Sequence, residues 1–427
     1  MNKMKVYKGD ILVIGSGAGA TGLVSELVKK NYNIIVADSG KKDVEWSKDF
    51  VERGKNIYKP NGTFPKSEEG VMYYRHLGIG GTVETSCANA VRFPDDYLSD
   101  YGITIDEELD EIEKYIGVTE MPDEFIGHNS NLLMDAAKEV GHSMNRMTKL
   151  IDFEKCKKCS FCEFMCFMDA RWSTMDKILS YEEDGKITFL DGLFIEKLEI
   201  ESDRARAAIG SVDGKTVRIE VDKIIVAAGG IGTPIILQNS GIEAGSNLFL
   251  DVYVNVYGRS KNFNNERNIP MAGFYRHPDE SFIIAPFMDA DLWHSLSKMK
   301  MSKWFNGEHY SGLMVKIADD SSGVVHANGI VNKEVTENDL ERINTGVEIA
   351  KKILLQAGVS EETIVVTSPK GAHPGGTASI GKVVDTDFKV KGMDNLYVAD
   401  ASLLPYAPGK PPIVTIMALG KKLGKAL

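Results

Sequence analysis

The stretch DILVIGSGAGA at residues 10–20 joins a short apolar run to a glycine-rich turn. The apolar run predicts a buried strand, and Leu23 and Leu27 mark one face of a helix after the turn. A second apolar run at residues 34–37 predicts the next strand. Strand, helix and strand in this order predict a βαβ unit, the start of an α/β fold on a parallel sheet.

The glycine-rich turn has the spacing of a dinucleotide-binding site. Gly15 suits the tight turn, Gly17 the close approach of a pyrophosphate, and Ala20 the packing of helix on strand. The N-terminus of the following helix offers free N–H groups to phosphates. Asp38, roughly 20 residues later, is placed to accept hydrogen bonds from ribose hydroxyls. A second glycine register begins at Gly17, inside the helix, and is the less favoured of the two.

Composition and charge narrow the class of protein. The chain has 427 residues, which predicts two or three domains. Its 50 basic and 61 acidic residues give a net charge of −11, which argues against nucleic acid or an anionic membrane as the main partner. The apolar runs are too short for a membrane span, and residues 1–9 lack the apolar segment of a secretion signal. We therefore expect a cytoplasmic protein.

The rest of the chain carries the patterns of further helices and strands. Apolar residues spaced by three and four predict helices at 105–115, at 131–140, over 340–354 and from 414 onward. Short apolar runs predict strands at 223–228, 252–257, 273–275, 282–286, 313–318 and 396–399.

Five further segments carry a family resemblance. They read GIGGTVETSCANAVRF (78–93), VAAGGIGTP (226–234), AHPGGT (372–377), NLYVADAS (395–402) and PIVTIMAL (412–419). With the first turn, they resemble the glucose–methanol–choline (GMC) oxidoreductases, and more narrowly the flavin subunits of bacterial gluconate, sorbitol and glucose dehydrogenases. The resemblance implies a Rossmann-like FAD-binding domain and a smaller α+β substrate domain on an antiparallel sheet.

The resemblance also implies how the chain is divided and how FAD is held. The expected parts are the first FAD-binding part (1–150), an iron–sulfur loop (151–180), the second FAD-binding part (181–245), the substrate domain (246–372) and the C-terminal FAD-binding and active-site part (373–427). Noncovalent FAD is expected, because Thr85 stands where some relatives carry a linking histidine. The expected FAD-binding residues are Gly15, Gly17, Ala20, Asp38, Gly80, Gly81, Thr82, Asn89, Ala228, Gly229, Thr233, Asp400, Ala401 and Thr415.

His373 occupies the position of the active-site histidine in the family motif. The resemblance implies that it takes the proton of a substrate hydroxyl while a hydride passes to the flavin, which suits a base of near-neutral pKa. A second His or Asn of the family falls on Pro411 or Pro412, and proline has no polar side chain. Lys410 could replace it, His373 could act alone, or the substrate is not a plain alcohol.

Four cysteines, Cys156, Cys159, Cys162 and Cys166, have the spacing of bacterial ferredoxin ligands. This spacing predicts one [4Fe–4S] cluster, with a [3Fe–4S] cluster or a structural zinc ion as alternatives. Cys87 is a second candidate for the fourth ligand. The gluconate and glucose dehydrogenase subunits that this chain resembles carry a cysteine-rich stretch at a similar place, and this resemblance favours iron over zinc.

The functional prediction is an FAD-dependent dehydrogenase acting on the hydroxyl group of an alcohol, polyol or sugar-like substrate. Its electrons would pass through the cluster to a one-electron carrier such as ferredoxin, flavodoxin or a redox subunit. Two alternatives are a ferredoxin-driven reductase of a keto or unsaturated substrate and a non-catalytic electron-transfer subunit. The substrate pocket is expected under residues 246–335, whose aromatic residues include Trp293 and Trp304.

Overall fold

The computed structural model describes residues 4–59, 63–94, 96–264, 269–288 and 309–427. Its first main element is a parallel sheet of five strands in the order β22-β12-β2-β3-β8. The opening apolar run forms β2 in the middle of this sheet, where all four of its residues are buried. The α/β fold with a parallel sheet is thereby confirmed. The bounds are β2 Ile11–Ile14, β3 Ile34–Ala37, β8 Thr188–Leu190, β12 Lys223–Val226 and β22 Leu396–Val398.

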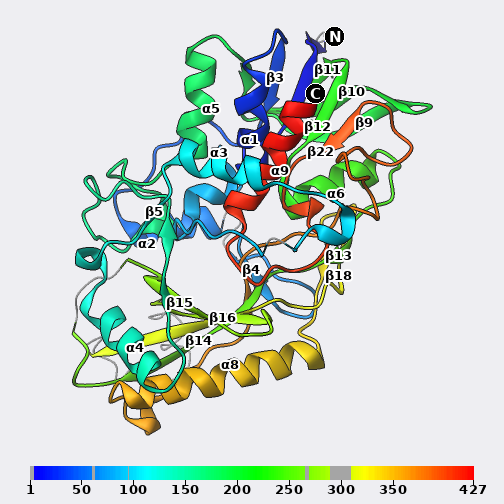
Figure 1. Cartoon of the computed structure of the whole chain (residues 1–427). Coiled ribbons are helices and arrows are strands. Elements are labelled where there is room, and N and C mark those ends of the chain that lie inside the picture. The colour runs from blue at the N-terminus through cyan, green and yellow to red at the C-terminus, as the bar shows by residue number, and fades with distance from the viewer. Residues whose placement is uncertain (1–3, 60–62, 95, 265–268, 289–308) are drawn as a thin grey trace.

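Helices far apart in the sequence meet beside this sheet (Figure 1). The helix after the glycine turn, α1 (Ala18–Leu27), packs along the last helix, α9 (Ile413–Ala426), and α3 (Asp106–Ile116) also contacts α9. Other helices are α2 Phe50–Tyr58, α4 His128–Glu139, α5 Thr174–Glu183, α6 Gly229–Asn239 and α8 Glu337–Gln356. Within the described ranges, none of the helices has the length and apolar character needed to cross a membrane.

A second, mostly antiparallel sheet has the order β4-β21-β14-β17-β16-β15-β6, with β20 also paired to β14. The two longest strands pair from Tyr253 opposite Lys316 to Arg259 opposite Tyr310. Helix α8 packs against this sheet, far from the two termini in Figure 1. The bounds are β4 Met72–Tyr73, β6 Asn145–Arg146, β14 Val252–Arg259, β15 Gly273–Arg276, β16 Phe282–Pro286, β17 Tyr310–Ile317, β20 Val365–Val366 and β21 Lys370–Gly371.

A four-stranded sheet in the order β1-β11-β10-β9 was not anticipated from the sequence. Its strands are partly exposed and mix charged with apolar residues, so they lack continuous apolar runs. The bounds are β1 Lys5–Lys8, β9 Phe194–Glu201, β10 Arg204–Val212 and β11 Lys215–Glu220. Smaller sheets contain β13 Ser246–Leu248, β18 Gly323–Val325 and β19 Val331–Asn332, and the pair β5 Thr119–Glu120 and β7 Thr148–Lys149.

The first and last helices touch backbone to backbone through glycines. A Cβ atom on Gly22 would lie 2.1 Å from the carbonyl oxygen of Met417, and one on Gly420 would lie 2.1 Å from that of Gly19. Such distances exclude any side chain at these positions. The contact holds the N-terminal turn of α1, which follows the dinucleotide-type glycines, against the C-terminal part of the chain.

We predict that Gly420→Val destabilises the protein, because the new side chain must push α9 away from α1. Overpacking of this kind costs about 1–3 kcal/mol or more. The measurement is urea unfolding, with Ala426→Val as the control because Ala426 is exposed on the same helix. Equal stability of the two variants would show that the helices do not depend on this contact.

Candidate active site

One cavity of about 1220 Å³ is lined by residues of both main sheets. Gly15, Gly17 and Asp38 line it from the parallel sheet and its first turn, whereas Lys316 and His373 line it from the antiparallel sheet and the turn after β21. The sequence motifs from distant parts of the chain therefore meet at one cavity.

The dinucleotide-type turn is ordered by a short chain of hydrogen bonds. Ser16 Oγ donates to Asp38 Oδ2 at 2.6 Å, and the backbone N–H of Gly80 donates to Ser16 Oγ at 2.8 Å. The N–H of Gly40 donates to the other carboxylate oxygen of Asp38 at 2.7 Å. Burial raises the pKa of Asp38 despite these bonds. The acidic side chain is thus held at the end of β3, facing the cavity.

The backbone of this turn leaves room for a ligand at one glycine and none at the other. Gly15 has a φ of +107°, and a Cβ there would lie 2.2 Å from the carbonyl oxygen of Ala227. A Cβ on Gly17 would meet nothing closer than 3.9 Å, so the space beside Gly17 is open. No side chain caps the N-terminus of α1, whose first turn lines the cavity.

The remaining sequence-predicted cofactor residues divide into two groups. Gly81, Thr82, Asn89, Ala228, Gly229, Asp400 and Ala401 line the cavity. Gly80, Thr233, Ala20 and Thr415 are buried but are not among the lining residues, and some of them support the lining from behind. Thr233 Oγ1, for example, donates to Asp400 Oδ2 at 2.5 Å, and the N–H of Gly229 donates to the same oxygen at 2.8 Å.

His373 is held at the cavity by a buried carboxylate that the sequence analysis did not single out. Its Nδ1 lies 2.9 Å from Oδ2 of Asp251, while Oδ1 of Asp251 accepts the N–H of Gly409 at 2.9 Å. Burial and the charge of Lys316 lower the pKa of His373 well below 6.5, so the imidazole is neutral at pH 7. Nδ1–H therefore donates to Asp251, and the hydrogen-bond contacts of His373 side-chain nitrogen atoms within the described residues all involve Nδ1.

The segment Leu250–Asp251–Val252 fixes both members of this pair. The carbonyl of Leu250 accepts the N–H groups of Ala372 and His373 at 2.8 and 2.9 Å. Asp251 has a φ of +49°, a left-handed conformation that is unfavourable for residues other than glycine. We call this segment the hub.

A buried ion pair holds the hub from behind. The carboxylate of Asp319 accepts the N–H groups of Leu250 and Val252 at 3.1 and 3.2 Å. Lys333 Nζ lies 2.9 Å from Asp319 Oδ2, and both side chains are fully buried. Burial raises the pKa of Asp319 to about 6 and that of Asp251 to about 7. These charged groups lie just outside the ends of the strands β14, β17 and β19, and a charge next to an apolar run was the available sequence signal.

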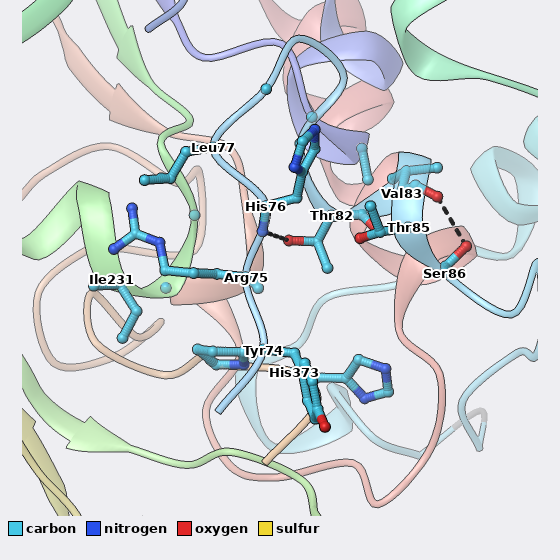
Figure 2. A pocket seen from close by; sticks show the side chains of 18 of the residues that line it. Tyr74, Arg75, His76, Leu77, Thr82, Val83, Thr85, Ser86, Ile231 and His373 are labelled. Carbon is cyan, nitrogen blue, oxygen red and sulfur yellow. Dashed lines mark hydrogen bonds between the residues drawn. The ribbon is translucent and has the colours of Figure 1, made fainter. Parts of the chain in front are cut away.

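Other candidates for the acid–base group are placed less favourably. Lys410 forms an ion pair with Glu280 and is not among the residues that line the cavity. His76 lines the cavity, as Figure 2 shows, but its Nε2 is buried against Gly78 and has no hydrogen-bond partner within the part of the chain that the structure describes. In the same view His373 lies beside the segment that carries Tyr74. Trp293 and Trp304 lie outside the described residues.

The cysteine loop lies at the same cavity. Phe161, Glu163 and Phe164, interleaved with the cysteines, line it. The thiols of the loop lie close enough to affect one another: Cys159 and Cys166 raise the pKa of Cys156, and Cys156 and Cys159 raise that of Cys162. Cys162 raises the pKa of Cys87 in the same way.

This arrangement does not form a metal site. Burial raises the pKa of Cys162 to about 12, against the effect of Lys149 and Arg171. Among the residues that the structure describes, no three Cys, His, Asp or Glu side chains are placed to hold one metal ion. The geometry as it stands does not fit a cluster, although the donor set does.

Comparisons with known proteins agree with this geometry. Two models of the GMC oxidoreductase family match residues 96–253 and 315–420. An uncharacterised protein of Methanocaldococcus jannaschii is 31% identical over 97% of this chain and 98% of its own length. A GMC-type oxidoreductase of Mycobacterium tuberculosis is 23% identical over 97% of this chain and 75% of its own length.

Two solved structures share the fold. Pyridoxine 4-oxidase from Mesorbium loti superposes with a TM-score of 0.73 at 15% identity, covering 98% of both chains. A formate oxidase from Aspergillus oryzae, studied for FAD modification, superposes with a TM-score of 0.75 at 15% identity, also covering 98% of both chains.

We predict that Lys333→Met destabilises the protein by about 3–5 kcal/mol, because it leaves the carboxylate of Asp319 buried without its partner. Asp319→Asn should also be destabilising, and the double variant should lose less than the sum of the two. Urea unfolding of the four proteins measures this coupling. Strictly additive losses would show that the ion pair does not support the hub.

Proposed function

The chain belongs to the GMC oxidoreductase family, and on that premise we propose that it is an FAD-dependent enzyme that oxidises a hydroxyl group. The observation that carries this proposal is the pair of His373 and Asp251 at the cavity that also contains the dinucleotide-type turn. His373 would take the hydroxyl proton, and FAD, when bound, supplies the acceptor for the hydride.

Several features support FAD as the occupant of the cavity. The open space beside Gly17 and the uncapped N-terminus of α1 suit a pyrophosphate, which needs close backbone approach and N–H donors. Asp38 faces the cavity with an orientation fixed by two hydrogen bonds, as a ribose ligand requires. The segment that contains Gly81, Thr82 and Asn89 would lie along the rest of the cofactor.

The protein environment suits His373 as a general base. A neutral imidazole whose Nδ1–H donates to Asp251 presents the lone pair of Nε2, and so it is a proton acceptor without any prior deprotonation. As the imidazole takes a proton, the carboxylate of Asp251 would stabilise the positive charge. The side chain of Asp251 is fully buried, whereas that of His373 is 20% exposed and lines the cavity, so the imidazole is the member of the pair that a substrate can reach.

We also propose, from the ligand spacing, that the loop of Cys156, Cys159, Cys162 and Cys166 holds an iron–sulfur cluster. The mutual influence of these thiols and the nearby cations Lys149 and Arg171 support the idea, because a thiolate-ligated cluster is anionic. Cys166 interacts with Cys156 and Cys87 with Cys162, so the ligand spacing is what favours Cys166 over Cys87 as the fourth ligand. The thiols would have to move closer together on loading. A one-electron carrier as redox partner stays a prediction.

We predict that His373→Asn retains its FAD but reduces it roughly 10²–10⁴-fold more slowly, the usual loss when a general base is removed. The measurement is anaerobic bleaching of the bound flavin by a panel of alcohols, polyols and sugars. His326→Asn is the control, because His326 is exposed and does not line the cavity.

The pH dependence follows from the sign of the pKa shift. Because the base must be neutral and its pKa is lowered, protonation of His373 itself should slow the wild-type reaction only below pH 6.5. Protonation of Asp251, whose pKa burial raises to about 7, should already reduce the rate around that pH, because the imidazole then loses its anionic partner. An unchanged rate in His373→Asn, or a wild-type rate that does not fall below pH 6.5, would contradict the assignment.

The cluster proposal predicts iron and acid-labile sulfide in protein purified without oxygen. Cys166→Ser should lose both, whereas Cys87→Ser should keep them. Inductively coupled plasma mass spectrometry and a sulfide assay measure this. Zinc without iron, or no metal at all, would contradict the proposal and leave the oxidoreductase assignment intact.

A further inference from the structure

The cavity contains a buried lysine that the described residues leave without a direct ion pair. Burial lowers the pKa of Lys316, and the charge of Asp251 counters that shift only in part. Lys316 lies in β17, is only 3% exposed and lines the cavity. Its Nζ is 3.5 Å from Nδ1 of His373, and no carboxylate of the described residues lies within 4.0 Å of it. Lysine is almost never fully buried unless it is paired.

Other buried lysines of the described chain are satisfied by protein oxygen atoms. They include Lys149, which donates to Asn89 Oδ1 and to the carbonyls of Cys87 and Pro270; Lys333, paired with Asp319; Lys410, paired with Glu280; and Lys421, paired with Glu26 and Glu111. Lys316 differs from them, because its neighbour Nδ1 of His373 already donates to Asp251 and so offers no lone pair. The N–H groups of Lys316 are therefore available to a ligand.

We propose that Lys316 binds a negatively charged oxygen atom of the substrate, next to Nε2 of His373. This proposal rests on the proposed function. The oxygen is either the reacting oxygen as it gives its proton to His373 or a carboxylate near the reacting carbon. In either case an ammonium group surrounded by apolar strands stabilises the charge more strongly than water does.

This placement assigns to Lys316 the polar contact that proline cannot supply at Pro411 and Pro412, which also line the cavity. The family's second His or Asn falls at Pro411 or Pro412, just before α9, whereas Lys316 lies in β17. The same ammonium group lowers the pKa of His373 and so keeps the base neutral. One residue thereby serves both substrate binding and the protonation state of the base.

The test uses two small trifluoromethyl probes, the neutral alcohol trifluoroethanol and the anion trifluoroacetate. Fluorine-19 NMR of the FAD-loaded protein measures the affinity of each probe without requiring turnover. Lys316→Met and Lys316→Gln remove the charge, and Lys352→Met removes one from the exposed face of α8 as the control.

We expect at least one probe to bind wild-type and Lys352→Met protein, and to bind both Lys316 variants roughly 10- to 100-fold more weakly, the scale of a hydrogen bond to a charged group. Loss confined to trifluoroethanol identifies the reacting oxygen, and loss that includes trifluoroacetate identifies a substrate carboxylate.

Unchanged affinities in the Lys316 variants, or no binding to wild-type protein, would overturn the proposal. Failure of both variants to fold would assign the ammonium group a structural role and overturn it as well. A purified protein without FAD would instead contradict the proposed function, so the two failures are distinct.

Discussion

The candidate active site depends on the hydrogen bond from Nδ1 of His373 to Asp251, which the protein makes only by holding Asp251 in a left-handed backbone conformation. Such a conformation costs on the order of 1 kcal/mol or more, so surrounding bonds must impose it. Asp319 supplies them by accepting the N–H groups on both sides of Asp251. The same segment offers the carbonyl of Leu250 to the backbone of His373, so that base and carboxylate share one support.

Charge balance explains why this arrangement can be buried. The buried charged groups lie at the adjoining ends of β14 and β17 or next to them. They are the two carboxylates of Asp251 and Asp319 and the two ammonium groups of Lys316 and Lys333. Lys333 compensates Asp319 directly, whereas Lys316 and Asp251 interact only at longer range. The set is close to neutral, but the charge of Lys316 is the least well compensated by the protein. An anionic oxygen from the substrate would complete the balance.

The sequence was most informative where local chemistry decides structure. The run before Gly15 is apolar throughout because β2 lies in the middle of a parallel sheet, and the turn after it needs residues without side chains. Asp251, Lys316 and Asp319 could not be assigned in this way, because the contacts that give them a role, with His373 and with Leu250, join residues 57 to 122 positions apart. Lys410 is adjacent to Pro411 in sequence, but its side chain pairs with Glu280. The strands β9 to β11 went unrecognised because their partly exposed faces interrupt the apolar pattern.

A crystal structure of the FAD-loaded protein tests the central claim most directly, because the claim concerns what the cavity holds and where. We expect the adenosine half of FAD at Asp38 and the isoalloxazine ring beside Nε2 of His373, with Nδ1 still bonded to Asp251. The ammonium group of Lys316 should face the same space. An isoalloxazine ring bound away from His373, or a His373 side chain turned out of the cavity, would contradict the account.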